Sequence, residues 1–175
     1  MAFASEFEYQ DELEELELLD FEDAPVDWKT RDWFQFHRFE DGHFEVRVSG
    51  FGLGADRPIL KEAPKGGVLK AHQGAVNKIV NEIKKIFVRG ACVNIVVSGY
   101  VDPQSESRYA EKISDNRAKF FFSRIWEKLL GDWARVKEHD ASGSGLLGSG
   151  LWSSKTSLER MLNRRVHVYV YPMRC

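Results

Sequence analysis

The sequence predicts an α/β (α+β) sandwich, in which one mixed sheet carries helices packed on one face. Three observations predict this fold class: alternating apolar and polar residues at 33–51 and 163–171, a β-branched run at 93–97, and long amphipathic segments at 68–88 and 109–130. Strands that alternate with helices along a chain favour such layers. With 175 residues, 43% of them hydrophobic, the chain is long enough to bury one core.

The first expected element is a hairpin, because Asp41-Gly42 separates two alternating runs rich in aromatic and β-branched residues. This hairpin adds an extra N-terminal strand to the fold. Residues 68–88 then repeat apolar side chains at helical spacing, which predicts a helix. The run Val93–Val97 suits a strand that is covered on both faces.

The second half begins with a helix over 109–130, which the apolar spacing again predicts. Residues 137–150 are rich in Gly and Ser, and we expect a long loop around a short strand. A short third helix is predicted over 153–162. The chain closes with alternating residues at 163–171, which predict a final strand.

Residues 1–28 form an acidic leader. They contain eleven Asp and Glu residues and no Lys or Arg, whereas residues 29–175 carry 16 acids against 25 bases. Aromatic and leucine residues lie between the acids, a pattern typical of a disordered segment that binds a partner. We expect a protein partner, or the chain's own basic domain, to receive this leader; a flexible tail without a partner is the alternative. The predicted division is a leader, 1–28, and a single domain, 29–175.

Composition limits the other classes of protein. No apolar run reaches 18 residues, so we expect no membrane span. The first 28 residues lack the basic segment and the uninterrupted apolar stretch of a standard secretory signal peptide, so we expect synthesis as a cytoplasmic protein. No nucleophile–base pair is evident, and the Lys and Arg residues are dispersed. We therefore expect no enzyme, no cofactor and no nucleic-acid partner.

The cysteines and histidines suggest no metal site. Cys92 and Cys175, the two cysteines, lack the spacing of metal ligands, and with so few cysteines we also expect no structural disulfide. His37 and His43 flank the hairpin turn, where exposure to solvent is the usual explanation for histidine.

An acid and an arginine stand out around the buried strand. Asp102 follows this strand, and Arg117 comes fifteen residues later, in the early part of the next predicted helix. An Asp accepts hydrogen bonds from an ammonium group, and the planar Arg fork binds a carboxylate at two points, so such a pair suits a zwitterion near solvent. From the spacing alone, a structural salt bridge between Asp102 and Arg117 is the alternative.

Three motifs around this pair occur in the order of a known family. They are Gly99-Tyr100-Val101-Asp102, the segment from Tyr109 to Ala118 (YAEKISDNRA), and Asn163-Arg164-Arg165-Val166. The chain resembles the OmpA-like, peptidoglycan-associated domain family over roughly residues 44–171. In that family a strand ends in Gly-His/Tyr-Thr-Asp, a helix carries Asn-x-x-Leu-Ser-x-x-Arg-Ala, and Asn-Arg-Arg-Val opens the last strand.

The resemblance implies non-catalytic binding of peptidoglycan through the meso-diaminopimelate residue of its stem peptide. The residues that match the family's ligand pair are Asp102 for the ammonium and Arg117 for the carboxylate. Tyr109 and Ser114 complete the expected site, with Ser114 in the first turn of its helix, and Arg164 is a secondary contact. Asn163, Arg164 and Arg165 are expected to brace the site and the sheet. The resemblance further implies action at the bacterial cell envelope, or within a secreted assembly.

The sequence departs from the family pattern at three places. Ala110 stands where the family has Asn, Val101 stands where it has Thr, and the loop at 103–108 lacks the usual Gly. The alternative function is therefore a structural or interaction protein that keeps the OmpA-like fold without the ligand. An example is a component associated with a phage-tail-like contractile injection particle, bound through residues 1–28.

Overall fold

The computed structural model describes residues 33–51, 68–103, 107–146, 148, 150, 155 and 157–175, and the predicted leader lies outside them. The described elements, in chain order, are β1 (Phe34–Arg38), β2 (Phe44–Ser49), α2 (Val68–Val88), β3 (Cys92–Gly99), α3 (Ser107–Leu129), the 3₁₀ helix η2 (Leu130–Arg135), β4 (Val136–Gly143), α4 (Ser157–Asn163) and β5 (Arg165–Met173).

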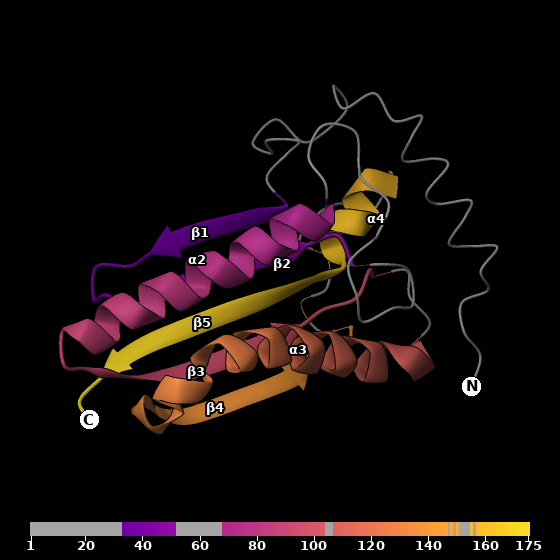
Figure 1. The fold of residues 1–175 in the computed structure, drawn as a ribbon. Helices are drawn as coiled ribbons and strands as arrows, with labels where there is room; N and C mark the ends of the chain where they lie inside the picture. The colour runs from indigo at the N-terminus through magenta and orange to yellow at the C-terminus, as the bar shows by residue number, and fades with distance from the viewer. Residues whose placement is uncertain are drawn as a thin grey trace.

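The strands form one five-stranded sheet in the order β1-β2-β5-β3-β4. Neighbours pair antiparallel except β3 and β4, which run parallel, so the sheet is mixed. Helices α2 and α3 lie side by side across it (Figure 1). The predicted fold class is confirmed. The short strand expected within 137–150 is β4, which begins one residue earlier.

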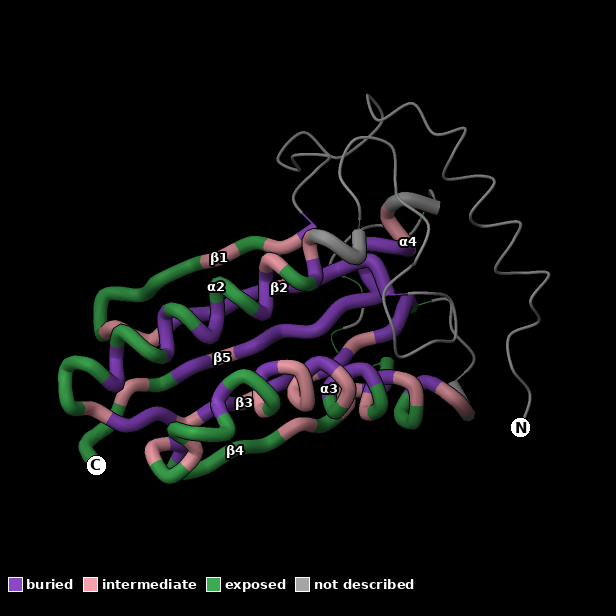
Figure 2. Tube along the Cα trace, viewed as in Figure 1, coloured by how far each residue is buried: buried purple, intermediate pink, exposed green. Residues whose placement is uncertain are grey.

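The core lies between the sheet and these two helices. Val46 in β2, Ile95 in β3 and Val168 in β5 belong to the same buried cluster as Ile83 of α2 and Phe121 of α3. Figure 2 shows most of β2, much of β5 and about every second residue of β3 as buried, with buried stretches on both helices. None of the helices described combines the length and the apolar character that crossing a bilayer requires.

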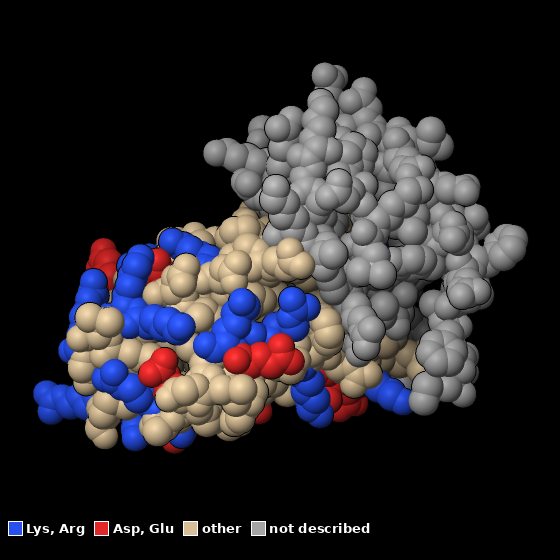
Figure 3. All heavy atoms as spheres, in the orientation of Figure 1, with Lys and Arg blue, Asp and Glu red and all other residues tan. Residues whose placement is uncertain are grey.

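Charged side chains on the helical side of the molecule pair with one another. Glu82 of α2 is 5% exposed and accepts hydrogen bonds from Lys78 (3.1 Å) and Lys85 (2.8 Å), and Arg38 of β1 also reaches it. Burial acts to raise the pKa of Glu82, but the hydrogen bonds from Lys85 and Lys78 outweigh it and lower the pKa to about 2. Figure 3 shows Lys and Arg spread over this face, with Asp and Glu among them.

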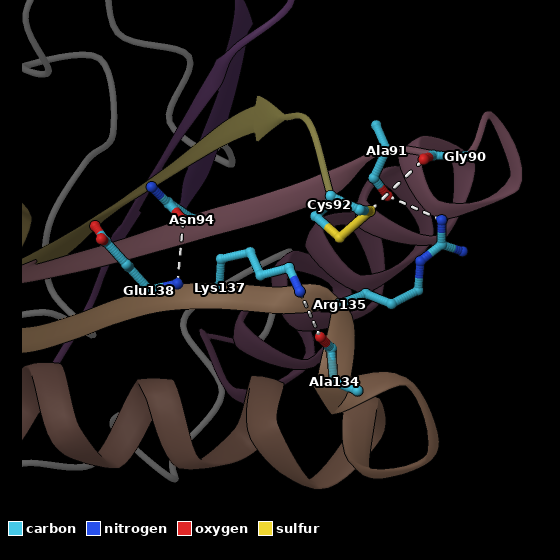
Figure 4. The surroundings of a disulfide bond; sticks show 9 residues. Gly90, Ala91, Cys92, Asn94, Ala134, Arg135, Lys137 and Glu138 are labelled. Carbon is cyan, nitrogen blue, oxygen red and sulfur yellow. Dashed lines mark hydrogen bonds between the residues drawn. A yellow bond between two sulfur atoms is a disulfide. The ribbon is translucent and has the colours of Figure 1, made fainter.

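A disulfide joins Cys92 to Cys175, so the expectation that the two cysteines stay unlinked is wrong (Figure 4). Cys92 opens β3, where it pairs with Met173 near the end of the antiparallel strand β5. This register brings the last residue of the chain to the first residue of the central strand, with 5.0 Å between the two Cα atoms. The expectation rested on the number of cysteines, which does not reveal that β3 and β5 pair and bring the two cysteines together.

Candidate ligand-binding site

The predicted ligand pair lies where β3 ends and α3 passes over it. Arg117 Nη1 donates a 2.8 Å hydrogen bond to the carbonyl oxygen of Tyr100, two residues before Asp102. The guanidinium of Arg117 therefore lies against the backbone that leads into Asp102. The bond brings helix α3 into contact with the segment before Asp102, and the roles of Asp102 and Arg117 as a ligand pair stay predictions.

Both members of the pair are buried, which corrects the expectation that they lie near solvent. Asp102 is 4% exposed and Arg117 is 1% exposed. The guanidinium of Arg117 also lies 5.8 Å from the ring centre of Phe51. A buried charge needs close polar partners, so replacing either residue by alanine is expected to cost stability.

Two glycines allow α3 to approach the sheet closely at this point. A side chain at Gly99, the last residue of β3, would overlap the carbonyl of Ser114, and one at Gly143, the last residue of β4, would overlap the Ser114 hydroxyl. The carboxylate of Asp115 also accepts a 3.3 Å hydrogen bond from the amide of Gly143. The backbone of α3 therefore packs directly on the ends of β3 and β4, and this contact positions Arg117 close to the end of β3.

The structure corrects the position expected for Ser114. Helix α3 begins at Ser107, so Ser114 lies about two turns inside the helix and is no N-terminal residue. Its side chain is fully buried, donating to the carbonyl of Glu111 (2.9 Å) and accepting from the amide of Gly145 (2.9 Å). The bond from Gly145 fastens α3 to the segment after β4, and the role of Ser114 in ligand binding stays a prediction.

The remaining predicted residues are Tyr109 and Arg164. Tyr109 is half-buried in the first turn of α3. Arg164 is 1% exposed, and its Nε donates a 2.7 Å hydrogen bond to the carbonyl of Phe51, the residue whose ring lies beside Arg117. Phe51 therefore links Arg164 to Arg117. Roles for Tyr109 and Arg164 in binding stay predictions.

A polar cluster behind the site was missed by the sequence reasoning. It lies on the sheet face opposite α2 and α3, where Glu45 and Arg47 of β2 are opposite Tyr169 and His167 of β5. Glu45 Oε1 lies 3.2 Å from His167 Nδ1 and accepts a 3.0 Å hydrogen bond from Arg47 Nε. The hydrogen bond with His167 and the one from Arg47 lower the pKa of Glu45 to about 2, although burial opposes them.

Arg165 joins this cluster to the end of β3. It is 2% exposed, and its Nε donates a 2.8 Å hydrogen bond to His167 Nε2. Its two terminal nitrogens donate to the carbonyls of Asn163 (3.1 Å) and Gly148 (2.9 Å), while the guanidinium lies 4.3 Å from the ring centre of Tyr100. Burial lowers the pKa of Arg165 to about 10, so the side chain stays cationic at neutral pH.

Comparisons with known proteins agree with this fold. No protein-family model matches the chain, and no curated protein matches its sequence. The periplasmic domain of Helicobacter pylori MotB is 14% identical, with a TM-score of 0.53 over 84% of this chain and 83% of that one. The OmpA-like domain of FopA1 from Francisella tularensis is 17% identical, with a TM-score of 0.47 over 81% of this chain and 80% of that one.

A third solved structure is the cell wall anchor of the type VI secretion system from Pseudomonas aeruginosa. It is 19% identical, with a TM-score of 0.45 over 74% of this chain and 81% of that chain. This chain has the fold of the OmpA-like domains, as the motif resemblance implied.

Proposed function

We propose that this chain is a non-catalytic peptidoglycan-binding domain that recognises the diaminopimelate residue of the stem peptide and so anchors or positions a partner at the cell wall. The observation that carries this proposal is the bond from Arg117 to the carbonyl of Tyr100, which places a guanidinium beside the strand end that carries Asp102. An ammonium and a carboxylate on one ligand carbon would meet Asp102 and Arg117 respectively.

The disulfide supports action outside the cytoplasm. Disulfides form and persist in oxidising compartments, such as the periplasm and cell surface, and are rare in the cytosol. The bond between Cys92 and Cys175 joins two ends of the central strands, as a structural disulfide does. A working place in the cell envelope, or in a secreted assembly, fits both the disulfide and the proposed ligand.

The test is co-sedimentation of the oxidised protein with purified sacculi. Because both charges are buried, Asp102→Asn and Arg117→Lys are better variants than alanine, since they keep most of the side-chain volume. Lysine offers a point charge in place of the planar fork. We expect each variant to bind at least about 30-fold more weakly, because disturbing one partner of a buried charge pair costs about 2–5 kcal/mol.

Matched controls separate the site from general charge. Asp132→Asn and Lys119→Arg change exposed residues in η2 and α3, and both proteins should bind as the wild type does. Sacculi with lysine in place of diaminopimelate lack the carboxylate proposed for Arg117, and binding to them should be weak. Equal binding of both sacculi, or full binding by Asp102→Asn and Arg117→Lys, would overturn the proposed ligand.

A partner for the acidic leader forms the second part of the proposal. Residues 1–28 carry eleven acids and no base, and the rest of the chain is basic. Deleting residues 1–28 should leave binding to sacculi intact or stronger, because the leader's negative charge no longer competes for the basic domain. If the deletion instead abolished binding to sacculi, the leader itself would be the contact with the wall.

A further inference from the structure

Tyr100 is the point through which the polar cluster meets the ligand pair. Its amide donates a 2.9 Å hydrogen bond to the carbonyl of Arg165, and its own carbonyl accepts the bond from Arg117. The Tyr100 ring lies under the Arg165 guanidinium and 4.7 Å from the ring of His167. A shift of Arg165 would therefore move both the backbone and the ring of Tyr100.

His167 in turn fixes Arg165. Because Arg165 Nε is the donor in its bond to His167 Nε2, that nitrogen carries the lone pair, and the ring proton is on Nδ1, facing Glu45. Neutral His167 thus accepts from a cation on one side and donates to an anion on the other. Arg47 holds the Glu45 carboxylate from the far side.

From this geometry we infer that Arg165, held by His167 and Glu45, is a positioning residue that sets Tyr100 and, through it, Arg117. The inference rests on the proposed function, because it concerns the same ligand pair. The chain of contacts crosses three elements, from β2 through β5 to the end of β3, before it reaches α3. Arg165 acts without touching the ligand.

A second proton on His167 would break this chain. Protonated Nε2 has no lone pair for Arg165 Nε–H, and two cations would then face each other. The charged and titratable groups that face His167 are Glu45 and Arg47 from β2, Arg165 and Tyr169 from β5, and Tyr100 from the end of β3. Burial lowers the pKa of His167 below its ordinary value of 6.5, so the chain is intact at neutral pH.

Two substitutions at His167 test the inference. His167→Gln keeps an oxygen that can accept from Arg165 and an amide that can donate to Glu45, but it does not titrate. His167→Leu fills similar space and removes both bonds. We expect His167→Leu to bind diaminopimelate-type sacculi at least tenfold more weakly than the wild type at pH 7.5, and His167→Gln to bind within twofold of it.

The pH profile separates positioning from a merely structural role. Because the pKa of His167 lies below 6.5, wild-type affinity should fall as the pH decreases below that value, while the affinity of His167→Gln stays flat over the same range. Equal pH profiles for the two proteins, or full binding by His167→Leu, would overturn the inference.

Nuclear magnetic resonance on the ligand-free wild type keeps the test independent of variant folding and of the ligand. The Arg117 Nε–H signal and the Tyr100 amide should shift with the same midpoint as the His167 ring. If those signals do not follow His167, the inference fails. If they do follow it but no sacculus binds, the proposed function fails while the coupling stands.

Discussion

Removing the disulfide is expected to lower the free energy of unfolding by several kcal/mol. The bond joins residues separated by 83 positions, so it closes a loop that contains β3, α3, β4, α4 and β5. In the chain-entropy model, a loop of this length restricts the unfolded state by about 4–5 kcal/mol at 25 °C, and measured losses are typically about 2–5 kcal/mol. The effect arises mainly in the unfolded chain, because the folded strands already hold both ends together.

Cys175→Ser is the most informative variant. Cys175 is exposed, whereas Cys92 is 1% exposed, so a change at Cys175 removes the cross-link without placing a hydroxyl in the core. Urea unfolding followed by circular dichroism should show a midpoint lower by roughly 1–2 M, given a slope of about 2 kcal/mol per molar urea. Reduced wild type should match the variant, and a reducing agent should not affect Cys175→Ser.

The reasoning would be refuted by a Cys175→Ser protein that unfolds at the same urea concentration as oxidised wild type. A free-thiol assay on the oxidised wild type under denaturing conditions checks the premise. It should detect no thiol in the intact chain and two after reduction.

The remaining predictions concern stability measured by urea or thermal unfolding. Gly99→Ala should lose about 1–3 kcal/mol by overpacking against the carbonyl of Ser114. Gly74→Ala, whose new Cβ would lie at an ordinary contact distance of 3.6 Å from the Phe34 ring, should be neutral or slightly stabilising, and equal behaviour of the two would contradict the close approach. Burial lowers the pKa of His72 to about 4. The contribution of neutral His72 to the free energy of unfolding is therefore complete above pH 6.5 and is lost as the pH falls through 4. His72→Gln should flatten that part of the plot of unfolding free energy against pH. Glu82 has its pKa lowered to about 2, so its contribution is present above pH 4.5 and is lost as the pH falls towards 2. Glu82→Gln should remove this acid-sensitive part, about 1 kcal/mol or less because its partners are substantially exposed, and an unchanged acid limb would contradict the pairing.

Local periodicity was sufficient to predict most of the fold. The helix predicted over 68–88 has the bounds of α2, because its apolar face packs on a sheet and nothing in the long-range structure interrupts it. The hairpin turn at Asp41-Gly42 was also found, since turn chemistry is a local property, and Gly42 has a positive φ of 90° there. Neither prediction depended on knowing which strands pair.

Features that depend on strand register could not be predicted from the sequence. The polar cluster exists because β2 and β5 are neighbours and place Arg47 opposite His167, although 120 positions separate them. The disulfide depends in the same way on the antiparallel register of β3 and β5. The alternating polar residues of β5 indicate a polar face of the strand, but they do not reveal which neighbouring strand supplies their partners.

Buried positive charge is concentrated where β3 ends and β5 begins. Three arginines there are each 1–2% exposed: Arg117, Arg164 and Arg165. Their guanidinium groups donate to backbone carbonyls of Tyr100, Phe51, Asn163 and Gly148. Burying a guanidinium costs several kcal/mol unless its surroundings compensate, and these carbonyls are part of what allows three arginines to be buried here. Under the proposed function, the ligand carboxylate would meet Arg117, while Arg164 and Arg165 would hold Phe51 and Tyr100 beside it.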